Sequence, residues 1–142
     1  MRRFAIAALL AMLMLVLAVS EAFAVSPHFN FATVTNVTSN TITVAFKEAG
    51  LGNSLNSVTI SLSATAECIN PGSKHPKAAN KESVSASGVF NVSNGQAHGS
   101  LTATASLSPP CSPPMTICWT DLSVTDATVS DTIDIPGTFR PT

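Results

Sequence analysis

The sequence has no tyrosine, a single tryptophan and few charged side chains, which make up only 11% of its 142 residues. Seven Lys and Arg residues against eight Asp and Glu residues give a formal net charge of −1. A surface that grips nucleic acid needs clustered basic residues, so this composition argues against a nucleic-acid partner. The length suits one domain rather than two.

The N-terminus has the three parts of a secretory signal peptide. Arg2 and Arg3 precede an unbroken apolar run over Phe4–Val19, and Ala22-Phe23-Ala24 places small residues before a cleavage point. We therefore expect a signal peptide over Met1–Ala24 and one secreted domain over residues 25–142, with no stable membrane anchor after cleavage. An uncleaved anchor is the alternative, because the run approaches the roughly 20 residues that span a bilayer.

Beyond residue 25 the hydrophobic period becomes two, and no sustained helical period follows. In Val58–Ala66 every even position is apolar and every odd position is Ser or Thr, and Thr41–Phe46 alternates in the same way. Such alternation is typical of an antiparallel sheet with one face on a core and one in water. The sequence predicts an all-β domain.

Asn94-Gly95 lies between two alternating segments, Ser83–Val92 and Ala97–Leu107. Asn-Gly is the preferred pair for a two-residue type I′ turn, because both central residues need positive φ. We expect a β-hairpin in which Phe90 faces Gly99 and Gly88 faces Leu101, each large side chain meeting a small one.

The remaining segments complete about seven strands, the pattern of an antiparallel, immunoglobulin-like β-sandwich, with a closed barrel as the alternative. A bulge is expected near Thr120-Asp121, where the alternation changes phase, and the last strand ends before Pro136-Gly137. The other expected strands are Phe29–Thr35 and Thr41–Glu48 around a Ser39-Asn40 turn, Ile117–Thr125 and Thr132–Ile135.

Three cysteines in an oxidising compartment suggest one disulfide and one odd thiol. We favour Cys68–Cys111, which ties together two irregular loops. Cys118 lies beside Trp119 in an expected strand and is interpreted as a buried apolar residue. Pairing of Cys118 with Cys68 is the main rival.

No catalytic, metal-binding or cofactor-binding motif is present, so we expect neither enzymatic activity nor a cofactor. The histidines His28, His75 and His98 stand outside any nucleophile or metal-ligand pattern. Four acidic residues near the C-terminus are interpreted as solvated strand and turn positions, with a calcium site as the alternative: Asp121, Asp126, Asp131 and Asp134.

The aromatic residues give little support for a sugar-binding platform. Trp119 stands alone, and four phenylalanines are assigned to the core: Phe29, Phe31, Phe46 and Phe90.

Two loops have unusual compositions. Ile69–Lys81 holds a local cluster of basic residues, and Ser108–Thr116 contains four prolines, which favour an extended, stiffened path. The basic cluster is interpreted first as a solvated loop and second as a contact for an anionic polymer or an acidic protein surface. Its members are Lys74, His75, Lys77 and Lys81.

Several segments together resemble a group of small secreted β-sandwich proteins of soil bacteria. These are Lys47–Gly52 (KEAGLG), His75–Lys81 (HPKAANK), Ser85–Phe90 and Pro136–Phe139 (PGTF). The resemblance covers nearly all of the chain after residue 25 and implies a disulfide between Cys68 and Cys111, whereas Cys118 departs from the group's pattern. It brings no established activity and hence no functional residues.

The AGLG turn also gives a fainter similarity to the apoproteins of enediyne chromoproteins, which are secreted sandwiches with a cleft for a hydrophobic ligand. Their two-disulfide pattern is missing from this sequence.

These observations favour a secreted, monomeric, non-enzymatic binding or surface-associated module, with an extracellular protein or polysaccharide as partner. The contacts are expected in the two unusual loops, because binding residues concentrate in loops held by a rigid scaffold. The alternatives are a carrier of a small apolar ligand between the sheets, a secreted hydrolase, and a protease inhibitor that uses the proline-rich loop.

Overall fold

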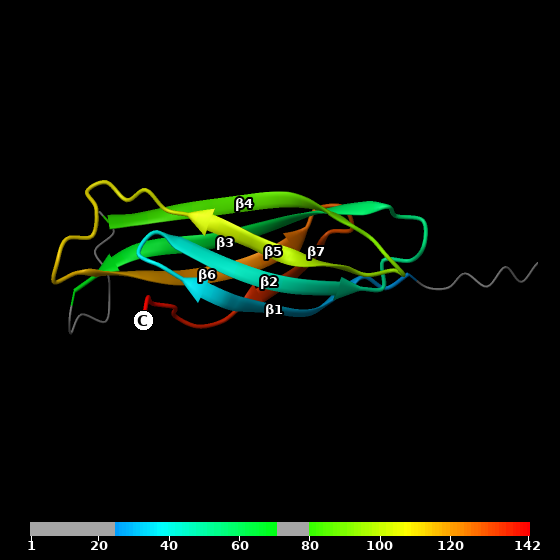
Figure 1. Cartoon of the computed structure of the whole chain (residues 1–142), viewed down its shortest axis with the longest axis horizontal. Helices are drawn as coiled ribbons and strands as arrows, with labels where there is room; N and C mark the ends of the chain where they lie inside the picture. The colour runs from blue at the N-terminus through cyan, green and yellow to red at the C-terminus, as the bar shows by residue number, and fades with distance from the viewer. Residues whose placement is uncertain (1–24, 71–79) are drawn as a thin grey trace, which may run out of the picture.

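A computed structural model describes residues 25–70 and 80–142, and these residues form seven β-strands and no α-helix. Figure 1 shows the strands running along a single long axis. The strands are β1 (His28–Val37), β2 (Thr41–Ala49), β3 (Ser57–Ile69), β4 (Lys81–Asn91), β5 (Ala97–Thr104), β6 (Thr116–Asp126) and β7 (Asp131–Ile135). The all-β prediction is confirmed. The expected signal peptide, Met1–Ala24, lies outside the described residues.

The strands form two antiparallel sheets that face each other. One sheet has the order β1-β2-β5 and the other the order β4-β3-β6-β7. The first sheet ends at β1 and β5, and the second ends at β4 and β7. A tight turn connects β4 to β5, and within the described residues these two strands are joined by one isolated bridge, Ser93–Gln96, rather than by a ladder. The sheets are therefore open, and the domain is the expected sandwich rather than the alternative barrel.

The period-two pattern places the core between the sheets. Ile42, Val44 and Phe46 on β2 are almost completely buried against Ile60 and Leu62 on β3, while the Ser and Thr residues between them face outward. Trp119 on β6 is fully buried. Backbone hydrogen bonds in both directions join Trp119 to Phe139, which brings the C-terminal segment alongside β6. The last strand ends before Pro136, as expected.

The expected hairpin around Asn94-Gly95 is correct in its turn and wrong in its strand pairing. Asn94 and Gly95 have φ values of 51° and 70°, as a type I′ turn requires. After the Ser93–Gln96 bridge, however, the chain passes to the other sheet, so that β4 pairs with β3 and β5 pairs with β2. The turn thus forms an arch between the sheets.

The bulge expected near Thr120-Asp121 is present. Two residues of β6, Asp121 and Leu122, lie opposite the single residue Ala64 of β3, and Asp121 has a φ of 51°. This extra residue lets both Trp119 and Leu122 point into the core.

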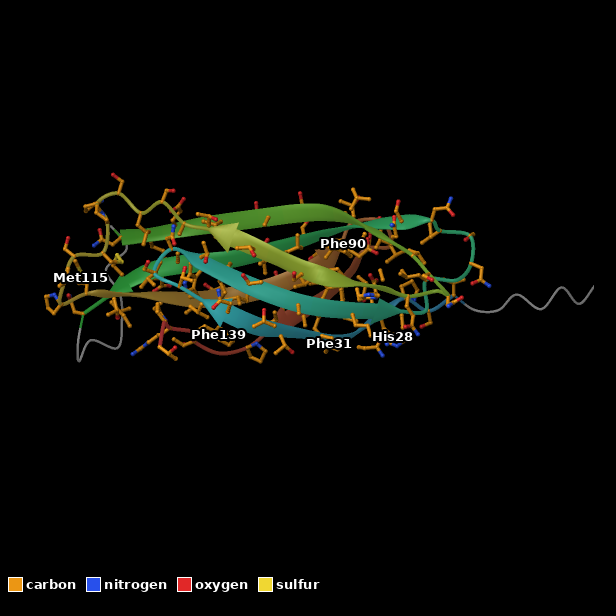
Figure 2. The ribbon with its side chains drawn as sticks, viewed as in Figure 1. His28, Phe31, Phe90, Met115 and Phe139 are labelled. Atoms are coloured by element: carbon orange, nitrogen blue, oxygen red, sulfur yellow. A yellow bond between two sulfur atoms is a disulfide. The ribbon has the colours of Figure 1, made fainter. Side chains whose placement is uncertain are left out.

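A second bulge, which the sequence analysis did not anticipate, changes the fate of one aromatic residue. The register of β1 against β2 shifts between Phe29 and Phe31. Phe29 packs inward in an edge-to-face contact with Phe46, whereas Phe31 is 44% exposed on the outer side of β1 (Figure 2). The assignment of Phe31 to the core was therefore wrong.

Candidate functional site

One end of the sandwich is held by a disulfide, and we call it the disulfide end. Cys68, near the end of β3, is bonded to Cys111 in the β5–β6 loop, with their Cα atoms 5.4 Å apart. The β1–β2 turn and the C-terminus lie at this same end (Figure 1). The favoured pairing, Cys68–Cys111, is thus the one in the structure, and the rival pairing with Cys118 is not.

The disulfide end contains a groove of about 530 Å³. The β1–β2 turn supplies Ser39 and Asn40 on one side, and the proline-rich β5–β6 loop supplies most of the other side; Met115 of this loop is labelled at the end of the molecule in Figure 2. The groove is predominantly apolar because most of its lining residues are: Ala105, Leu107, Pro110, Cys111, Met115, Ile117 and Pro141. Its volume lies in the range of about 300–1,000 Å³ that is typical of small-molecule sites.

The basic loop is placed only in part. Lys74, His75 and Lys77 lie outside the described residues. Lys81, at the start of β4, forms an ion pair with the buried carboxylate of Glu67 on β3, with 3.0 Å between Nζ and Oε1. Because this carboxylate binds it, the pKa of Lys81 is raised. Lys81 therefore has a structural partner within the chain, which its interpretation as part of a solvated basic loop did not predict.

Cys118 is a free thiol buried in β6, as its apolar interpretation predicts. Burial raises the pKa of this thiol, although the nearby Arg140 opposes the shift. A raised pKa lowers the fraction of the reactive thiolate. This environment suits a packing residue more than a nucleophile.

Two carboxyl groups meet in the interior near the opposite end of the sandwich, where β2 and β6 finish. Glu48 and Asp126 are both fully buried, one on each sheet. Burial, together with the nearby carboxyl groups of Asp126 and Asp131, raises the pKa of Glu48 to about 8. Glu48 is thus protonated at neutral pH and faces Asp126.

Oδ1 of Asp126 accepts a 2.7 Å hydrogen bond from the backbone N–H of Thr128, whereas Oδ2 of Asp126 and both carboxyl oxygens of Glu48 are buried without a hydrogen bond to the described residues. Asp131, at the start of β7, accepts one from the backbone N–H of Phe29 and adds to the negative potential at Glu48. The interpretation of Asp126 as a solvated turn residue was wrong. The alternation of the strands could have predicted this burial. Glu48 continues the buried even-numbered positions of β2, and Asp126 continues those of β6 after Leu122 and Val124.

The other residues considered for chemistry lie at the surface. His28 is exposed at the start of β1, and its Nδ1 contacts the carbonyl oxygen of Ser26 at 2.9 Å. His98 is exposed on the outer face of β5, opposite Lys47 of β2. His75 lies outside the described residues. Within residues 25–70 and 80–142, no group of three or more His, Cys, Asp or Glu side chains is arranged to hold a metal ion.

The fold and these sites define a two-layer, seven-stranded antiparallel β-sandwich with one disulfide and an apolar groove beside it. In comparisons with known proteins, no family model, curated protein or solved structure matches the chain. Within the described part of the chain, no helix is long and apolar enough to cross a membrane.

Proposed function

We propose that this protein is a secreted, non-enzymatic binding module that contacts an extracellular protein or polysaccharide through its disulfide end. The observation that carries the proposal is the groove, where a disulfide-clamped, proline-rich loop and a tight turn enclose a mostly apolar hollow. Prolines restrict the backbone of the loop, so less conformational entropy is lost when a partner binds.

The remaining evidence supports export and a scaffold role. The N-terminal sequence fits a signal peptide, and disulfides persist in oxidising compartments. The sheet orders β1-β2-β5 and β4-β3-β6-β7 support an immunoglobulin-like classification, a sandwich architecture in which loops at one end commonly bind partners.

The proposal is tested by recovering partners from the native extracellular fluid, and from immobilised extracellular polysaccharide, with the oxidised protein as bait. Met115→Glu and Leu107→Glu each place a charge in the groove, whereas Thr33→Glu places the same charge on the outer face of β1. We expect the groove variants to lose at least tenfold in affinity for the recovered partner and Thr33→Glu to retain it. A partner that binds all three variants equally would refute the assignment to the disulfide end.

A second candidate, carriage of a small apolar ligand, is favoured by the volume and lining of the same groove. Titration with a small uncharged aromatic probe such as naphthalene, followed by NMR, distinguishes the two. Saturable chemical-shift changes confined to residues such as Leu107, Met115 and Ile117 would favour the carrier. If no such changes occur, the carrier function is rejected and binding of a macromolecular partner is favoured.

A further inference from the structure

The two long sides of the sandwich are protected to different degrees. On one side, β1 carries two register shifts and β7 is a strand of five residues with Asp131 and Asp134, and these features obstruct strand addition. On the other side lies β4, an edge strand of eleven residues whose register against β3 is uninterrupted from end to end. Figure 1 shows β4 along one margin of the molecule.

The free edge of β4 presents a regular row of backbone groups. The N–H of Val92 donates to the carbonyl of Asn56, in line with the β3–β4 register. Because antiparallel pairing alternates, the even-numbered residues of β4 direct their N–H and C=O groups to β3, and the odd-numbered ones direct theirs outward. The outward set belongs to Ser83, Ser85, Ser87 and Val89.

From Ser83 to Val89 the side chains along this edge are neutral, and none is larger than valine. Lys81 and Glu82, the charged residues of β4, are both engaged within the chain, Lys81 with Glu67 and Glu82 with the backbone N–H of Ser106. The apolar positions on the inner face, such as Val84 and Ala86, are only half-buried, and Val89 is 69% exposed on the outer face. From Ser83 to Asn91 the edge thus lacks the charges, prolines and bulges that normally prevent pairing with another strand.

We propose that two copies of this chain pair through β4, antiparallel about a two-fold axis, so that the two four-stranded sheets join into one. Full overlap of Lys81–Asn91 with its copy places Ala86 opposite Ala86 on the axis and makes the outward-pointing odd residues hydrogen-bonded partners.

This register is self-complementary, and for that reason a second copy suits the edge. On the inner face Val84 lies opposite Gly88 of the copy, so the valine side chain has room because glycine has no side chain. On the outer face Ser85 meets Ser87, and Ser83 meets Val89, which the pairing covers. The charged end residues Lys81 and Glu82 meet Asn91 and Phe90 of the copy, so no like charges are opposed.

The test is the oligomeric state of the oxidised protein, recovered in its secreted form, by analytical ultracentrifugation from micromolar to millimolar concentration. The double variant Ser85→Lys/Ser87→Lys brings four ammonium groups together at the proposed contact, and like charges directly opposite weaken strand pairing. We expect the wild type to dimerise and this variant to dimerise at least tenfold more weakly. Ser85→Glu/Ser87→Glu is expected to behave in the same way, and an equimolar mixture of the two variants to recover the dimer.

The matched control is Ser61→Lys/Ser63→Lys, which adds the same charge to the outer face of β3, away from the edge. It is expected to dimerise like the wild type. The register is tested by Ala86→Cys, because residues paired across the axis come within disulfide distance, whereas Thr33→Cys on β1 is expected not to cross-link. A wild type that stays monomeric at millimolar concentration, or a dimer indifferent to the Lys pair at positions 85 and 87, would overturn the proposal.

Discussion

The ring of Phe90 on β4 lies against the backbone of Gly99 on β5, across the gap between the two sheets. A Cβ atom at position 99 would overlap this ring, and the same ring packs edge-to-face on Phe46, with centroids 4.8 Å apart. The contact therefore joins both sheets near the arch at Asn94-Gly95.

Gly99→Ala is expected to lower the free energy of unfolding by about 1–3 kcal/mol, because the added methyl group must displace the Phe90 ring. Chemical denaturation measures the change. In a Phe90→Leu background the penalty is expected to shrink, since the obstructing ring is gone. Ser100→Ala, at an exposed neighbouring position, serves as the control and is expected to have little effect. An equal penalty in both backgrounds would show that the ring is not the cause.

Loss of the disulfide is expected to destabilise the sandwich without unfolding its core. Cys68 and Cys111 are 43 residues apart in sequence, and for such a loop the chain-entropy model gives a contribution of about 3–4 kcal/mol. The double variant Cys68→Ala/Cys111→Ala is expected to lose about that much in urea denaturation and to become insensitive to reductant. Cys118→Ala should keep the reductant sensitivity of the wild type. If it instead lost that sensitivity, Cys118 would be a disulfide partner.

The Glu48–Asp126 pair is expected to make stability depend on pH. Glu48 keeps its proton up to about pH 8 in the folded state, and in the unfolded chain it loses the proton near its ordinary pKa of 4.5. Between these values unfolding releases a proton, so the contribution of Glu48 to the free energy of unfolding falls by about 1.4 kcal/mol per pH unit as the pH rises.

Glu48→Gln keeps a neutral side chain of similar size facing Asp126 and removes this titration. The stability of the wild type relative to the variant is therefore expected to decline steadily from about pH 4.5 to 8 in denaturation curves. Asp134→Asn, an exposed substitution on β7, controls for the change in net charge. A constant difference between wild type and Glu48→Gln across this range would mean that Glu48 is ionised in the folded protein.

The bulge at Asp121 is expected to discriminate sharply between substitutions. Asp tolerates the left-handed conformation, Gly adopts it freely, and a β-branched residue is strained there. Asp121→Gly is expected to preserve or slightly raise the melting temperature, and Asp121→Val to cost about 1–2 kcal/mol. Equal melting temperatures for the two variants would contradict this role of the positive φ.

The sequence pattern predicted most strand positions because period-two alternation reports which side of a strand is buried. It does not report which strand lies alongside. Phe90 and Gly99 face each other whether β4 and β5 share a sheet or oppose one another, so the contact was predicted correctly from a hairpin that does not form. The long-range β2–β5 and β3–β6 pairings had no local signal.

The burial of Phe31 and Asp126 was predicted wrongly, and in each case the reason is local. Phe31 has the same parity as Phe29, and only a bulge in β1 turns it outward. Asp126 was predicted to be solvated because it is charged, although it lies two residues after the buried Val124 and therefore on the same, inward face of the strand. The groove could not be foreseen, because it needs the β1–β2 turn, the β5–β6 loop and Pro141 to converge at one end.

The arch at Asn94-Gly95 also bears on how the chain folds. β5 pairs with β2 rather than with β4, which precedes it, and β3 pairs with β6. Both sheets are therefore completed by pairings between segments far apart in sequence. Closing large loops before contacts form slows folding, and topologies rich in such non-local pairs fold in milliseconds to seconds. The β3–β4 hairpin lacks β6, the second neighbour of β3, until the last third of the polypeptide has been synthesised. A chain truncated from its C-terminus is therefore expected to remain unfolded rather than form a smaller native domain.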